Sequence, residues 1–204
     1  MCFVGQIVNQ QQRQLLAWHK GVLPKLTTEA APEEVTGLLL LYPSHFLHVV
    51  EAELTQLTEF ARALVPLTEK EDLTMEVRVL ACTDDIPSRM FTGWQSSIVG
   101  QHSASAAPSE GVIHVPLPTR IADTYISLLK LGRALAHAKG PEREGMLADL
   151  RTRHAETLPT QNLLSEVAQA EDALKVAEFV HIFTKPIDIK LNREVWPVET
   201  ELVY

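Results

Sequence analysis

The stretch Val35-Thr-Gly-Leu-Leu-Leu-Leu-Tyr42, then Pro43-Ser44, then His45-Phe-Leu-His-Val-Val-Glu51, decides the fold. Each apolar run has the length of a buried strand, and Pro43-Ser44 between them is typical of a tight turn. Two strands that follow each other so closely pair as an antiparallel hairpin. The stretch therefore predicts two neighbouring strands of one sheet.

The sequence on either side predicts three further strands and two helices. The strands are Met1–Val8, Met75–Cys82 with one solvated face, and Trp94–Val99, and the helices are Gln10–Leu26, ended near Pro24, and Leu54–Val65, closed by Pro66. The resulting order over residues 1–100 is β-α-β-β-α-β-β. This order predicts an α+β domain of ferredoxin-like layout, in which an antiparallel sheet carries two helices on one face.

The second half of the chain has a different pattern. Residues 101–118 are small and polar and are expected to be a linker, and residues 119–184 form a helical region. Its predicted helices are Ile121–Ala138, Glu142–Thr157 and Leu163–Phe183. Residues 185–204 are apolar without a helical or strand period, which predicts an extended tail that lies on a surface. We expect Trp196, with Val195, Pro197 and Leu191, to bind a partner, because aromatic anchors often dominate interfaces.

Composition excludes several classes of protein. The 204 residues hold 18 Lys and Arg against 26 Asp and Glu, a net charge of −8, and 46% are apolar. Disorder of the whole chain is excluded, and the acidic balance argues against nucleic-acid or membrane partners. No apolar run approaches the ~20 residues of a membrane span. Two cysteines make no disulfide framework, which favours a reducing, cytoplasmic location.

Motifs of catalysis are missing from the sequence. It has no GxSxG, no phosphate-binding glycine loop and no HExxH, and Cys82 at a strand end is expected to be a buried, inert thiol. His45 and His48, three apart on a strand, point to opposite faces and cannot share a metal ion. An acylphosphatase needs an Arg on a glycine-rich loop after the first strand, whereas Asn9–Arg13 has no glycine. We therefore predict no catalytic residue and no metal.

The hairpin, the helix after it and Ile86-Pro-Ser-Arg-Met-Phe-Thr-Gly-Trp94 together resemble the BLUF family, the flavin-binding blue-light sensor domains. The likeness covers about half of the chain, residues 1–100. In that family a Tyr, an Asn and a Gln hydrogen-bond the flavin ring. The resemblance thus implies the same fold and, where these three residues are kept, a bound flavin.

This chain departs from the family at the flavin contacts. The family's Gln falls on His48 and its Asn on Ala30, and Phe3 and Val4 stand where the first strand should carry the Tyr. Alanine and phenylalanine offer no hydrogen bond to a flavin. Trp94 matches the family's tryptophan. The comparison predicts a fold retained without photochemistry and without a cofactor.

A closer resemblance is to BLUF-like proteins of motile cilia, which include a testis-expressed member. The matching residues are Thr36–Pro43, Phe46–Glu51 and the "VWP" element Val195–Pro197. The resemblance implies a non-enzymatic structural subunit of the ciliary axoneme that binds other axonemal proteins, with tubulin as a further candidate. The alternatives are a flavin-binding light sensor or regulatory module and a small acylphosphatase-like enzyme.

Overall fold

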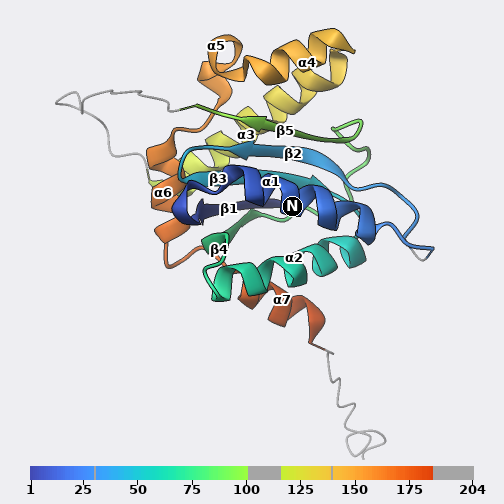
Figure 1. The fold of residues 1–204 in the computed structure, drawn as a ribbon, viewed down its shortest axis with the longest axis vertical. Coiled ribbons are helices and arrows are strands. Elements are labelled where there is room, and N and C mark those ends of the chain that lie inside the picture. The colour runs from blue at the N-terminus through green and yellow to red at the C-terminus, as the bar shows by residue number, and fades with distance from the viewer. Residues whose placement is uncertain (30, 101–115, 139, 186–204) are drawn as a thin grey trace, which may run out of the picture.

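The structure is a computed structural model that describes residues 1–29, 31–100, 116–138 and 140–185. Five strands alternate with helices in the first hundred residues, and helices alone follow (Figure 1). The strands are β1 Cys2–Ile7, β2 Thr36–Leu41, β3 His45–Glu51, β4 Thr74–Ala81 and β5 Trp94–Ile98. The helices are α1 Gln12–Val22, α2 Leu54–Glu69, α3 Leu117–His137, α4 Pro141–Ala148, α5 Leu150–Arg153, α6 Gln161–Gln169 and α7 Val176–Thr184.

The strands form one sheet in the order β4-β1-β3-β2-β5. The first four pair antiparallel in the ferredoxin-like order, which confirms the predicted fold class. β5 differs from the prediction because it pairs parallel with β2. The loop after β4 returns the chain to the end of the sheet where β2 begins, and the Gly37 N–H donates to the Gly93 carbonyl there at 3.3 Å.

One face of the sheet carries α1 and α2, as predicted, and α7 in addition. Phe3 of β1, Leu39 of β2, Phe46 of β3 and Phe60 of α2 belong to its core, and all four side chains are fully buried. α1 ends at Val22, and a 3-10 helix that contains Pro24 follows it. This is the face that the resemblance associates with a flavin.

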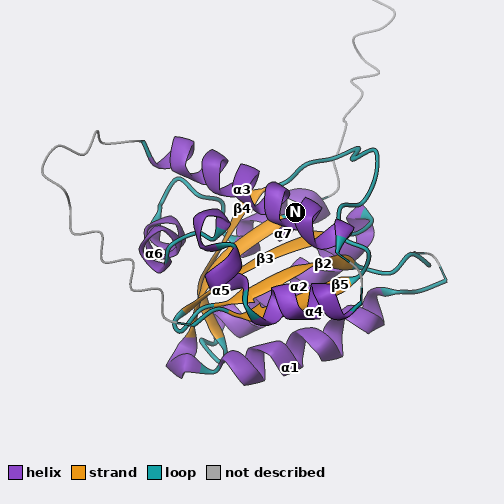
Figure 2. Ribbon diagram, turned by 90° about the horizontal axis from the view of Figure 1, so that it is seen from above, coloured by secondary structure: helices purple, strands orange, loops and turns teal. Residues whose placement is uncertain are grey.

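The opposite face is covered by the helices of the second half of the chain (Figure 2). Val4, Leu38 and Leu47 of the sheet share one apolar cluster with Leu131 of α3 and Leu164 of α6. The helical region therefore completes the core of the sheet. The predicted solvated face of the fourth strand is wrong, since Arg78 of β4 is only 4% exposed beneath α6.

Three helices differ from their predicted extents. α2 continues beyond Pro66 to Glu69, and Thr68 donates its hydroxyl to the Leu64 carbonyl in the turn that contains the proline. The charged segment from Glu142 to Thr157 is broken into α4, α5 and a 3-10 helix, Ala155–Thr157. α3 begins at Leu117, inside the predicted linker, and the rest of that linker up to residue 115 lies outside the described residues.

The predicted helix Leu163–Phe183 is two helices on opposite faces of the sheet. α6 packs with the cluster that holds α3, and α7 packs with the cluster that holds α2. Between them the chain passes the edge of β4, where the Val79 N–H donates to the Leu174 carbonyl at 2.8 Å. The crossing explains why a single helical period cannot run through this segment.

None of the helices within the described ranges is long and apolar enough to span a bilayer. Cys2 is buried on β1, whereas Cys82, directly after β4, is exposed. The expectation of a buried Cys82 is therefore wrong, because the strand ends one residue before it.

Candidate functional site

His48 lies at the centre of the sheet, on the face covered by α1 and α2. Its strand β3 runs between β1 and β2, and His48 itself pairs with Phe3 on one side and Leu39 on the other. The side chain is fully buried, and its Nε2 accepts a hydrogen bond from the Trp94 indole N–H at 2.9 Å. Because an indole nitrogen only donates, the neutral His48 ring carries its proton on Nδ1. That Nδ1 has no partner among the described residues.

A second buried histidine, His19, meets the first, and the sequence prediction missed it. It lies on α1, is fully buried, and donates its Nδ1 proton to the Leu15 carbonyl at 2.8 Å. Its ring centroid lies 4.8 Å from that of His48 at an angle of 80°. Leu15, His19 and Leu23 recur every four residues, so helical spacing alone could have placed His19 on the buried side of α1.

Aromatic rings close the space around the two histidines. Phe60 of α2 lies 5.3 Å from His48 and 5.8 Å from His19 between ring centroids, and Phe3 of β1 lies 5.6 Å from Phe60. Trp18 of α1 stands 5.9 Å from Phe60. The layer between the sheet and its two helices is thus filled by side-chain rings that touch each other. We refer to His19, His48, Trp94, Phe60, Phe3 and Trp18 as the ring cluster.

Burial keeps both histidines of the ring cluster neutral. Loss of solvent lowers the pKa of His19 to about 4 and the pKa of His48 well below its usual range, and the neighbouring His19 lowers the latter further. Burial also raises the pKa of the Cys2 thiol to about 12. Both shifts move the histidines of the ring cluster away from the pKa near 7 that suits a general acid or base.

The ring cluster does not fit the flavin that the resemblance implies. His48 spends its acceptor nitrogen on Trp94, Phe3 offers no hydrogen bond, and the rings of Phe3 and Phe60 occupy the volume above the sheet. Ala30, the third predicted position, lies outside the described residues. The Nδ1–H of His48 stays without a partner among the described residues, but the rings of Phe3 and Phe60 fill the space in which an isoalloxazine ring would have to lie against it.

Glu51 connects the three sequence motifs through hydrogen bonds, a role that the sequence prediction did not assign to it. It is 8% exposed, and its carboxylate accepts from the Met90 N–H at 2.9 Å, the Phe91 N–H at 3.0 Å and the Thr36 hydroxyl at 3.0 Å. The residues Thr36, Glu51 and Phe91 of the three motifs thus form one hydrogen-bonded anchor. The anchor fixes the loop that leads into Trp94.

The remaining predicted positions contribute no site. His45 faces away from His48, as predicted, and its Nδ1 lies 2.9 Å from the Ser44 hydroxyl. Within the described part of the chain, no three His, Cys, Asp or Glu side chains gather as metal ligands would. The predicted partner-binding residues Leu191, Val195, Trp196 and Pro197 lie outside the described residues.

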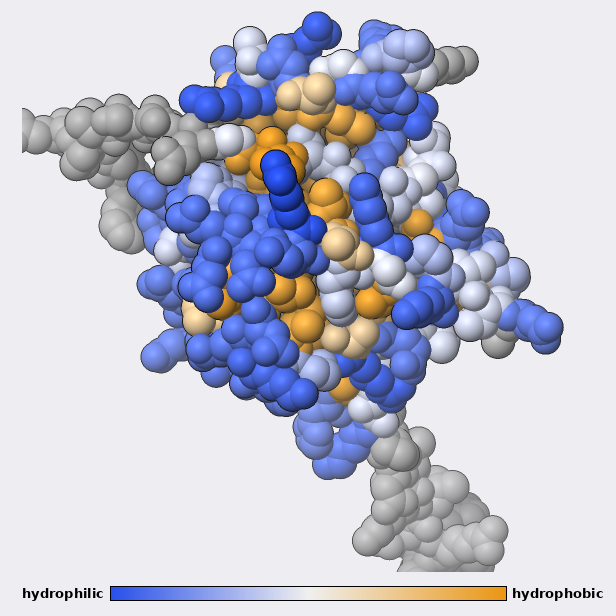
Figure 3. Space-filling view, in the orientation of Figure 1, coloured by the Kyte–Doolittle hydropathy of each residue, from blue (hydrophilic) through white to orange (hydrophobic). Residues whose placement is uncertain are grey.

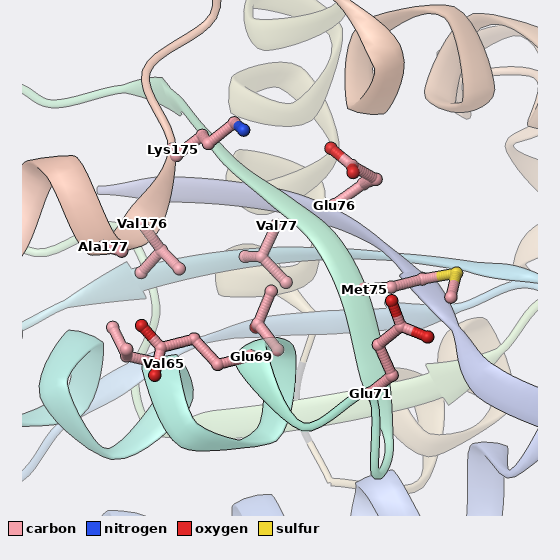
Figure 4. Close-up of a pocket in the computed structure, with 10 residues that line it drawn as sticks. Val65, Glu69, Glu71, Met75, Glu76, Val77, Lys175, Val176 and Ala177 are labelled. Atoms are coloured by element: carbon pink, nitrogen blue, oxygen red, sulfur yellow. The ribbon is translucent and has the colours of Figure 1, made fainter.

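A small pocket lies away from the ring cluster, where α2, β4 and the start of α7 meet (Figure 4). Val65, Val77 and Val176 line its apolar wall, and Glu76 and Lys175 stand at its rim. Its volume is about 160 Å³, below the roughly 300 Å³ of the smallest usual ligand sites. The pocket therefore does not suit a cofactor.

The sequence matches the family described as testis-expressed protein 47 over residues 1–185. The chain belongs to this family. The match confirms the predicted likeness to a testis-expressed group, and it includes the ring cluster, the Glu51 anchor and all seven helices of the structure.

Solved structures similar to this chain include light-regulated proteins. A bacterial light-regulated adenylyl cyclase is 14% identical over 72% of this chain, with a TM-score of 0.37, and the match spans 38% of that chain. BlsA in its photo-activated state is 13% identical over 83% of this chain and 94% of its own, with a TM-score of 0.35. BlsA in its ground state is 14% identical over 90% and 97%, with a TM-score of 0.32. We assign the fold from the sheet order, and we transfer no activity from these proteins.

Proposed function

We propose that this testis-expressed protein 47 family member is a non-enzymatic structural subunit of the motile-cilium axoneme. The observation that carries the proposal is the ring cluster: a fold that resembles a light sensor has packed this layer with side-chain rings, of which Phe3, His19, His48 and Phe60 are fully buried. Such a layer stabilises the domain, and the function then depends on the surface of the domain, where partner proteins bind. The testis-expressed family supports a role in a cell type that builds a flagellum.

The end of α7 is the docking surface on the described residues that best suits such a role. Ile182 is 57% exposed and Phe183 49%, while Phe179 one turn earlier is buried. The rings of Phe179 and Phe183 stack 4.3 Å apart between centroids, which connects the surface rigidly to the core. The apolar sequence with Leu191 and Trp196 follows directly. Adjacent exposed apolar side chains of this kind mark interaction sites.

The partners are other axonemal proteins, and tubulin is a further candidate. The chain carries a net charge of −8, so contact with an acidic partner needs the cations near the end of the chain, Lys185, Lys190 and Arg193. We propose no nucleic-acid and no membrane partner, a location in the cytoplasm of the cilium, and no enzymatic activity.

Fractionation of sperm flagella tests this function. After detergent extraction the protein is expected to remain with the axonemes and to leave only at high salt; recovery in the detergent-soluble fraction overturns the proposal. In a binding assay with extracted axonemes, the double variant Ile182→Ser/Phe183→Ser is expected to lose retention. Ile126→Ser on α3, an equally exposed isoleucine at 48%, is the matched control.

The absorbance of the purified protein tests the flavin-sensor alternative. The proposal expects a colourless protein. A bound flavin with a light-dependent spectral shift would instead support the sensor.

A further inference from the structure

The two edges of the sheet differ in how they are protected. At one edge, the segment after α6 covers β4 with a backbone hydrogen bond from Val79 to Leu174 and a bridge between Arg78 and Lys175. At the other edge, β5 pairs with β2, and no further strand among the described residues pairs with β5. Strand edges in soluble proteins are usually guarded by charges, proline or a covering element, but β5, Trp94-Gln-Ser-Ser-Ile98, has no charge and no proline.

The hydrogen-bond pattern shows which backbone groups of β5 face outward. The Gly93 carbonyl and the Val99 N–H both bond to β2. Since neighbouring residues of a strand alternate in direction, Gln95 and Ser97 also face β2, and Trp94, Ser96 and Ile98 direct their N–H and C=O groups away from it. Ile98 is 57% exposed at this edge.

A groove runs along the open edge. It has a volume of about 910 Å³ and lies between α4 and the end of α1 with its 3-10 helix. Its lining includes Lys20, Leu23, Val35, Ser96, Glu144 and Leu147. The Ser97 hydroxyl donates to the Leu147 carbonyl at 2.6 Å, which holds α4 beside β5. Figure 3 shows apolar side chains gathered between polar rims on the face of the molecule that carries α1 and α4.

The geometry of the groove matches an added strand. The groove is lined by Trp94, Gln95 and Ser96 of β5, by residues at the end of α1 and in the 3-10 helix after it, and by Glu144 and Leu147 of α4. The Gln95 Oε1, which lines the groove, is a buried acceptor with no partner among the described residues. Strand addition at an exposed edge uses these features: backbone hydrogen bonds provide affinity, and wall pockets select alternate side chains.

The C-terminal sequence of this protein contains a segment that fits such a slot. Residues 185–204 have no period as a whole, but the six residues Ile187-Asp-Ile-Lys-Leu-Asn192 within them alternate apolar and polar side chains, the pattern of a short half-buried strand. It carries one anion and one cation, Asp188 and Lys190, and the groove walls carry Lys20, Glu34 and Glu144. Asp188 of the segment can therefore pair with Lys20 of the groove, and Lys190 with Glu34 or Glu144.

The segment cannot reach β5 of its own chain. β4 and β5 lie at opposite edges, four strand spacings or about 19 Å apart. Lys185 ends the described chain after α7, which packs beside β4 and α2 (Figure 1). From Lys185 to Ile187 an extended chain spans at most about 7 Å. The occupant must come from a second molecule.

We propose that residues 187–192 of a second copy of this chain pair with the outer edge of β5 in this groove. The copies then associate head to tail, or reciprocally as a dimer, through the open edge of the sheet. This inference does not rest on the axonemal role, because it concerns the isolated protein.

Light scattering of the full chain after size exclusion tests the proposal. The wild-type protein is expected to associate as its concentration rises. Ser96→Pro removes an outward N–H and is expected to weaken association about tenfold, as for the loss of a backbone hydrogen bond with added steric conflict. Ser96→Ala, which keeps the N–H, is the matched control and is expected to associate like the wild type. A monomeric wild type at every concentration, or equal effects of the two variants, overturns the proposal.

A second variant guards against a folding defect in β5. Ile189→Asp leaves the described domain unchanged and breaks only the alternation of the segment, so it is expected to give a monomer with wild-type thermal stability. A labelled peptide of residues 185–194 is expected to bind this monomer and to raise its own fluorescence anisotropy. Continued association of Ile189→Asp, or a peptide that does not bind, shows that another surface or another partner occupies the groove.

Discussion

The two edge strands of the sheet, β4 and β5, differ in whether a neighbouring segment of the chain bonds to their outer side. The β4 edge is closed by the chain itself, because Arg78 donates to the Ala168 and Ala173 carbonyls, both at 3.1 Å, and holds the crossing between α6 and α7. The β5 edge is held on its inner side by the hydrogen bond from Trp94 to His48 and by the bonds from the preceding loop to Glu51, and within the described part of the chain no strand pairs with its outer side. The β4 edge therefore stabilises the fold, whereas the β5 edge is the one that we propose to pair with a second copy of the chain.

The largest expected loss of stability is at the closed edge. Arg78→Ala leaves the buried Ala168 carbonyl and the partly buried Ala173 carbonyl without this donor and opens a cavity under α6, so the free energy of unfolding should fall by about 4 kcal/mol. Urea denaturation measures it. Arg62→Ala removes an exposed ion pair with Glu59 on α2 and should cost no more than about 0.5 kcal/mol. Equal effects of the two variants would mean that Arg78 does not hold the crossing.

A glycine beside the open edge should have the next largest effect. Gly37 of β2 has φ +150°, and a Cβ there would lie 2.1 Å from the Val49 carbonyl oxygen. Gly37→Ala should therefore lower the free energy of unfolding by about 3 kcal/mol. Gly93, its hydrogen-bond partner on the β5 side, has open space around its Cα, so Gly93→Ala should leave the thermal midpoint nearly unchanged.

The anchor of the β5 loop should have a smaller effect. Glu51→Gln keeps the shape of the side chain but removes the charge that strengthens its bonds to Met90 and Phe91, at a cost of about 2 kcal/mol. Hydrogen exchange of the Met90 and Phe91 amides should accelerate most. Glu33→Gln is the matched control, since Glu33 holds the same loop through Arg89 at 2.6 Å but is 66% exposed. Equal acceleration in both variants would mean that the exposed Glu33–Arg89 ion pair holds the loop as strongly as Glu51 does.

Much of the closed core was predictable from the sequence, because periodicity determines it. The strand order, both helices of the first face and the opposed directions of His45 and His48 follow from runs and alternation of apolar residues. The parallel pairing of β5 was not predictable, since it depends on where a twelve-residue loop returns the chain.

The edges and the polar contacts escaped prediction for a related reason. Arg78 belongs to a strand whose alternation predicts a solvated face, and only α6, ninety residues later, buries it. His19 meets His48 across two elements, and Glu51 meets Met90 across the sheet. Such contacts depend on tertiary distance, which local propensity does not contain.

The last prediction has the smallest effect when it is taken per histidine and per pH unit, and it concerns the ring cluster, which contacts β5 through Trp94. The pKa of His19 is about 4 in the folded state and about 6.5 in an unfolded chain, so below pH 6.5 the unfolded state binds the extra proton. Its contribution to stability is complete above pH 6.5 and is lost as the pH falls toward 4, by about 1.4 kcal/mol per pH unit. His48, whose pKa is also lowered, adds a loss of the same sign.

Urea denaturation at several pH values between 7 and 5 measures this slope. His19→Gln should reduce it by about 1.4 kcal/mol per unit while losing some stability at pH 7, because the glutamine has no titrating proton. His181→Gln on α7 replaces an exposed histidine outside the ring cluster and is the matched control. If the His19 variant keeps the full slope, His19 is not the group whose protonation destabilises the fold, and the prediction is wrong.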